Sequence, residues 1–89
     1  MAKMIFTQQL ARFTEVPEIE TSATRLREAL ETAFEANSRL RGYILDEQGH
    51  LRPNVVIFID GLRVRDRLKL DTALDPSSHI YVLQALSGG

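Results

Sequence analysis

Apolar residues recur at helical spacing between Ala23 and Asn37. They stand at relative positions i, i+3, i+4, i+7 and i+8, which places them on one stripe of an amphipathic helix. The stripe consists of Leu26, Ala29, Leu30, Ala33 and Phe34. Ser22 or Thr24 can cap the start of this helix. The polar residues on its other side, Arg27 among them, are expected to face solvent.

Strand patterns lie on both sides of the predicted helix. Before it, Lys3–Gln8 and Glu18–Thr21 predict two short strands that form an N-terminal hairpin. After it, the apolar run Val55–Ile59 is the strongest strand signal. Asp60-Gly61 suits a tight turn, so Leu62–Arg67 is predicted to return as the next strand. The segment around residues 40–45 is expected to be a brief strand or an irregular wall of the core.

The last ten residues combine a strand with a bare end. Ile80 and Val82 alternate with Tyr81 and Leu83, a period of two that predicts a strand extending to Leu86. Beyond that strand no side chain is larger than a serine. We therefore expect a folded domain at residues 1–85 and a flexible arm at residues 86–89, which includes Leu86, Ser87, Gly88 and Gly89.

Composition removes several classes of function. A chain of 89 residues with 44% hydrophobic and 26% charged residues is one ordinary globular domain. Its net charge of −1 provides no general attraction to nucleic acid or to an anionic membrane. The absence of cysteine excludes disulfides, thiolate metal sites and a cysteine nucleophile. The apolar start is too short for a signal peptide and no stretch is long enough for a membrane span, so a cytoplasmic protein is expected.

The order of these elements, with a final strand that ends in Gly-Gly, is similar to the β-grasp, ubiquitin-like fold. Within it, the chain most resembles the bacterial sulfur carrier proteins of the molybdopterin-synthase small subunit and thiamin sulfur carrier family. The resemblance is carried by residues 26–30, 54–61 and 80–89. It implies the α+β class, with a mixed sheet of about five strands and one main helix packed on one face.

The resemblance also implies a chemistry at the C-terminus. In this family a ubiquitin-activating-like adenylyltransferase uses ATP to adenylate the terminal carboxylate, here that of Gly89, and sulfur then replaces AMP to give a thiocarboxylate. Glycine at 88 and 89 lets the backbone approach a nucleotide closely. The chain would be a co-substrate rather than an enzyme, although it could be counted as the small subunit of a synthase, and it would bind no cofactor itself.

Two questions stay open at this point. The sulfur acceptor would be a biosynthetic enzyme, either the molybdopterin synthase large subunit or an enzyme of the cysteine synthase type, and these branches fit the strand and tail residues better than thiamin synthesis does. The alternative function is that of a ubiquitin-like protein modifier, or of a non-catalytic interaction module, without sulfur transfer.

The run Val55–Ile59 is apolar on both faces, whereas a single helix layer covers one face of a sheet. If the odd-numbered residues point to the helix, then Val56 and Phe58 point outward, and Tyr81 and Leu83 can join them. We predict an exposed apolar patch there that docks partner enzymes. The alternative is that the loop at residues 40–52 covers it.

Three arginines, Arg63, Arg65 and Arg67, alternate along the predicted returning strand. They would form a basic stripe, which is either an electrostatic docking site or a solvated strand edge that discourages aggregation. His50 and His79 are isolated in the sequence, so no metal site is predicted.

Overall fold

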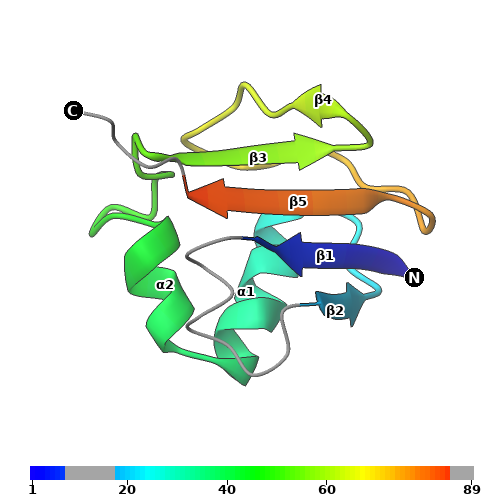
Figure 1. Ribbon diagram of the computed structural model, residues 1–89, viewed down its shortest axis with the longest axis horizontal. Helices are drawn as coiled ribbons and strands as arrows, with labels where there is room; N and C mark the ends of the chain where they lie inside the picture. Colours follow the sequence, from blue (N-terminus) through cyan, green and yellow to red (C-terminus); the bar gives the residue numbers. More distant parts are fainter. Residues whose placement is uncertain (8–17, 85–89) are drawn as a thin grey trace.

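The computed structural model describes residues 1–7 and 18–84 of the chain. They form a five-stranded sheet and two helices (Figure 1). The strands are β1 (Ala2–Phe6), β2 (Glu18–Thr21), β3 (Val55–Ile59), β4 (Leu62–Arg63) and β5 (His79–Gln84), and the helices are α1 (Leu26–Ala36) and α2 (Arg39–Ile44). The predicted α+β class with a mixed sheet is confirmed.

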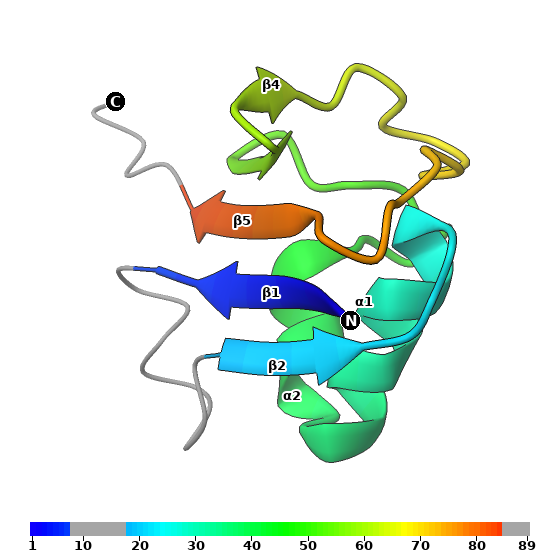
Figure 2. The same ribbon diagram turned by 90° about the vertical axis from the view of Figure 1, so that its right-hand side faces the viewer.

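The sheet has the strand order β2-β1-β5-β3-β4. β5 lies in its centre, parallel to β1 and antiparallel to β3, and the other pairs are antiparallel. The predicted hairpin of β1 and β2 is present, and Figure 2 shows these strands beside β5. Asp60 and Gly61 both have positive φ, of 50° and 85°, as the tight turn between β3 and β4 requires.

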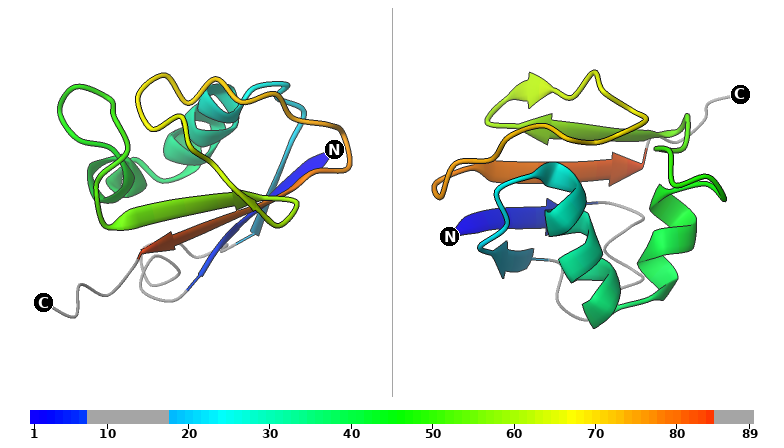
Figure 3. Two further views of the ribbon diagram at one scale, coloured as in Figure 1. Left: turned by 90° about the horizontal axis from the view of Figure 1, so that it is seen from above. Right: turned by 180° about the vertical axis from the view of Figure 1, so that it is seen from behind.

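Both helices pack on the same side of the sheet, as the view from above in Figure 3 shows. All five residues of the predicted helical stripe are buried there. The inward residues of the strands meet them, so that β1 and β3 show strict alternation of buried and half-buried positions. No helix among the described residues is long and apolar enough to cross a membrane.

The start of α1 differs from the prediction. The residue before the helix is Arg25, and neither Ser22 nor Thr24 caps it with its side chain. Instead, the first amide groups of the helix donate to a distant loop: Leu26 N–H bonds the Thr72 carbonyl at 2.9 Å and Arg27 N–H bonds the Leu70 carbonyl at 2.8 Å. These backbone acceptors satisfy donors that a capping side chain would otherwise satisfy.

The Arg27 side chain was expected in solvent, and that expectation is wrong. Its guanidinium donates to the carbonyls of Gly49 at 2.8 Å and of Leu68 and Lys69 at 2.9 Å. Arg27 therefore joins α1 to two separate loops. It is a structural residue of the helix layer.

The segment 40–45 forms most of the second helix, α2, and not a strand or an irregular wall. Leu40 and Ile44, four residues apart, are fully buried, which is the spacing of a single helical stripe. Gly42 lies in the middle of this helix and lowers its helical propensity. Because the apolar stripe is short and a glycine lies within it, the sequence pattern did not predict this helix.

Candidate functional site

The candidate site is the face of the sheet opposite the helices, which we call the outer face. Its centre is formed by β3 and β5, whose register places Val56 beside Leu83 and Phe58 beside Tyr81. All four side chains alternate with residues that point to the helices. The structure therefore brings together the four apolar residues that the sequence suggested as a patch.

Side chains on the outer face are more exposed to solvent than the neighbouring side chains that point to the helices. Tyr81 is 40% exposed, and Val56, Phe58 and Leu83 are half-buried, whereas Ile57 is only 1% exposed. The alternative cover, the loop at residues 40–52, does not lie over this patch, because its residues Leu40 and Leu51 belong to the core on the helix side. The right-hand view of Figure 3 shows α2 in that layer. The docking role of the patch stays a prediction.

One apolar member of the outer face was missed in the sequence. Ile5 of β1 pairs with Tyr81 in the parallel register of β1 and β5, and it is half-buried. Its alternation with the buried Met4 and Phe6 was visible in the sequence. What the sequence did not reveal was that β1 neighbours β5, because that pairing joins the two ends of the chain.

Beside Ile5 the outer face becomes charged. The Lys3 ammonium lies 3.1 Å from the Glu18 carboxylate of β2. The hydrogen bond with this carboxylate, and then its negative charge, raise the pKa of Lys3 above its ordinary value. Glu20, which pairs with Lys3 across the strands, acts in the same direction. In the part of the chain that the structure describes, β1 and β2 thus contribute two carboxylates and one ammonium group to this edge of the sheet.

The arginines on the other edge are not one stripe. β4 ends at Arg63, so no regular strand extends to Arg67 as was predicted. Arg63 and Arg65 are exposed, whereas Arg67 is half-buried and its guanidinium donates to the carbonyls of Arg52 and Val55. Arg67 therefore does not belong to the predicted exposed stripe, because its guanidinium is held by the two backbone carbonyls that it donates to near the start of β3.

The predicted reactive end lies outside the described residues. This applies to Leu86, Ser87, Gly88 and Gly89, and the boundary predicted at residue 85 falls there too. The described part of β5 ends at Gln84, opposite Val55. Five residues follow Gln84 in the sequence, and a fully extended chain of that length reaches at most about 17 Å. An enzyme acting on Gly89 must therefore lie close to this end of the sheet.

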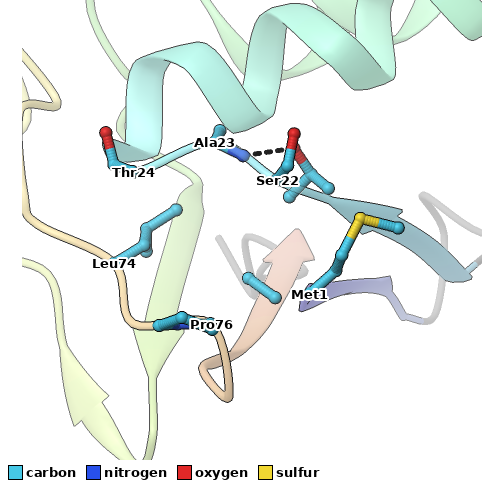
Figure 4. Close-up of a pocket in the computed structure, with 8 residues that line it drawn as sticks. Met1, Ser22, Ala23, Thr24, Leu74 and Pro76 are labelled. Atoms are coloured by element: carbon cyan, nitrogen blue, oxygen red, sulfur yellow. Dashed lines mark hydrogen bonds between the residues drawn. The ribbon is translucent and has the colours of Figure 1, made fainter.

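A small depression of about 180 Å³ lies at the opposite end of the sheet, near the start of β1 (Figure 4). Met1, Leu74 and Pro76 line it together with the segment that leads into α1, where Ala23 N–H donates to Thr21 Oγ1 at 3.1 Å. Since β1 and β5 are parallel, β5 also begins at this end, and Gln84 lies at the other end of the sheet. Among residues 1–7 and 18–84, no group of three or more His, Cys, Asp or Glu side chains is placed to hold a metal ion.

Comparison with known proteins identifies the fold. No family model matches the chain, and no curated protein matches it. Among solved structures, the small archaeal modifier protein 1 of Methanosarcina acetivorans is 26% identical, with a TM-score of 0.82 over 99% of this chain and 95% of that one.

Two further structures agree with this match. The small archaeal modifier protein 1 of Haloferax volcanii is 15% identical, with a TM-score of 0.84 over 99% of this chain and 98% of that one. The Amycolatopsis orientalis BexX/CysO complex contains a chain that is 14% identical, with a TM-score of 0.85 and full coverage of both chains. These matches confirm the predicted ubiquitin-like β-grasp fold.

Proposed function

We propose that this ubiquitin-like β-grasp chain is a sulfur carrier whose reactive group is the carboxylate of Gly89. The observation that carries the proposal is the outer face: an apolar patch centred on β5, the strand whose next residues lead to Gly88-Gly89 within about 17 Å. An enzyme that docks on this patch can bind the end of the chain in its active site while it stays bound to the folded domain.

The chemistry proceeds in two displacements. A carboxylate oxygen of Gly89 attacks the α-phosphorus of ATP on a ubiquitin-activating-like adenylyltransferase, and pyrophosphate leaves. Hydrosulfide from a sulfide donor then attacks the acyl carbon, the bond to AMP breaks and AMP leaves, and loss of the S–H proton gives the thiocarboxylate. Glycine at both positions suits a narrow nucleotide site, because no Cβ obstructs the backbone. The chain supplies the acyl group and the docking surface, and its partner supplies the catalysis.

The proposed acceptor is a biosynthetic enzyme of the molybdopterin synthase large-subunit or cysteine synthase type. A thiocarboxylate sulfur is a soft nucleophile, which suits transfer to an electrophilic carbon of a precursor. Incubation of the thiocarboxylated chain with each enzyme and its precursor distinguishes the two acceptors, because only the correct pair returns Gly89 to a carboxylate and releases a sulfur-containing product.

Intact-mass spectrometry tests the central step. The purified chain is incubated with ATP, the adenylyltransferase and a sulfide donor, and the mass gain of oxygen-to-sulfur replacement is expected. A truncated chain that lacks Gly88 and Gly89 is the matched control and should show no gain. If the full chain keeps its mass under conditions that convert a known carrier, the sulfur-carrier function is wrong.

A second candidate, a ubiquitin-like protein modifier, is favoured by the 26% identity to a small archaeal modifier protein over 99% of this chain. In that case the activated Gly89 would acylate lysine ε-amines of other proteins. Digestion of conjugates and mass spectrometry would then find isopeptide-linked remnants of the tail. Free thiocarboxylate that a biosynthetic enzyme consumes supports the first candidate, and isopeptide remnants support the second.

A further inference from the structure

We infer that the charges at the two ends of the outer face set the orientation in which the adenylating enzyme docks. The partner's surface is then an apolar recess with basic groups on the β2 side and acidic groups on the β4 side. This inference rests on the proposed function, and it adds residues outside the apolar patch to the partner contact.

On the outer face, the registers define one complete row across all five strands. It contains Glu18, Ile5, Tyr81, Phe58 and Arg63, in the order β2, β1, β5, β3 and β4. An acidic residue stands at one end, three apolar or aromatic residues in the middle and an arginine at the other end. Four strand spacings separate the two charged residues, which is about 19 Å. The row therefore carries a negative charge at one end and a positive charge at the other, with the apolar residues between them.

Among the described residues, ion pairs do not cancel the charge at the two ends of the outer face. On the β2 side Lys3 pairs with Glu18, so that the described residues Lys3, Glu18 and Glu20 together carry a net negative charge. On the β4 side Arg63 and Arg65 are exposed, and neither belongs to any ion pair found among the described residues. The two ends thus have opposite sign.

This polarity matters because the apolar patch alone does not fix rotation. A partner could bind four apolar side chains in several rotations about the normal to the sheet. Only some rotations direct the end of β5 toward the nucleotide site, and the tail reaches no more than about 17 Å beyond Gln84. Opposite charges at the ends of a row perpendicular to β5 select one rotation and accelerate the correct encounter.

Charge reversal at each end tests the inference. The variants are Glu18→Arg and Arg63→Glu, and the matched controls are Glu35→Arg and Arg39→Glu, which make the same charge changes at exposed positions of the helix layer. The association rate constant with the adenylyltransferase is measured by stopped flow at low and high salt, and conversion of Gly89 is followed in parallel by intact mass.

Each outer-face variant is expected to associate about tenfold more slowly than the wild-type chain at low salt, and high salt should remove most of the difference. The controls should stay within about twofold of wild type. Equal rates for outer-face variants and controls would overturn the orientation inference while conversion of the wild-type chain upholds the carrier function. If association depends on Glu18 and Arg63 but Gly89 of the wild-type chain is never converted, the orientation inference stands and the carrier function is wrong. If the wild-type chain does not bind the adenylyltransferase, the orientation inference is wrong.

Discussion

Two adjacent residues of β3, Ile57 and Phe58, should respond differently to truncation, because one side chain lies in the core and the other on the outer face. Ile57 is 1% exposed and packs under the helices, so Ile57→Ala is expected to lower the free energy of unfolding by about 3 kcal/mol. Phe58 is half-buried and lies beside Tyr81 on the outer face. Phe58→Ala leaves no enclosed cavity, so the loss reduces to a cross-strand contact with Tyr81 and some burial, about 1 kcal/mol.

The assay is urea denaturation of the purified variants, followed by far-ultraviolet circular dichroism. A domain of 89 residues is expected to have a total stability of roughly 4 to 13 kcal/mol, so both variants should give measurable transitions. If Ile57→Ala does not fold, Ile57→Val replaces it with an expected loss of about 1 kcal/mol. Binding to the adenylyltransferase should show the reverse ranking, because only Phe58 faces the partner. A loss of about 3 to 5 kcal/mol for Phe58→Ala would refute its outward assignment.

Three further predictions concern residues that hold the loops and turns. Arg27→Met should lower the free energy of unfolding by about 2 kcal/mol and accelerate amide exchange in both loops whose carbonyls the guanidinium contacts. Gly61→Ala should lower it by about 1 kcal/mol because φ is +85°, whereas Gly42→Ala, in a helix with open space around a new Cβ, should raise it by about 0.5 to 1 kcal/mol. Backbone N–H groups, first that of Asp71, donate to the Asp66 carboxylate and lower its pKa, so the carboxylate stabilises the fold above its unfolded pKa of about 3.9 and this contribution is lost as the pH falls through the folded value. The urea midpoints of wild type and Asp66→Ala should therefore differ at neutral pH and converge in acid.

Each of these predictions has a clear contrary result. Unchanged exchange in the loops for Arg27→Met would mean that water replaces the guanidinium without cost. Equal signs for the two glycine variants would contradict the assigned backbone conformations, since neither position is crowded. A gap between wild type and Asp66→Ala that widens in acid would show that the carboxylate is destabilising in the folded state.

Local patterns predicted the elements better than they predicted side-chain environments. The stripe from Leu26 to Phe34 and the alternation in β3 repeat over at least five residues, and all inward positions are buried as expected. The second helix was missed because its two buried residues, Leu40 and Ile44, are too few to establish a period and Gly42 interrupts them.

The side-chain environments that were predicted wrongly or missed depend on segments far away in the chain. Whether Arg27 or Arg67 reaches solvent is decided by carbonyls from loops far away in the chain, which no local spacing reveals. The place of Ile5 beside Tyr81 likewise depends on the parallel pairing of the first and last strands. The apolar patch itself was predictable, because two strands with apolar residues on both faces cannot bury both against one helix layer.

The register of β5 decides which of its side chains a partner meets. Because side chains alternate along a strand, a slip of one residue would turn Tyr81 and Leu83 into the core and expose Ile80 and Val82. β5 is held along both edges, and on each side buried residues of the neighbouring strand stand opposite Ile80 and Val82. The packing that stabilises the core therefore also fixes the outer face, and it does so on the strand that leads to Gly89.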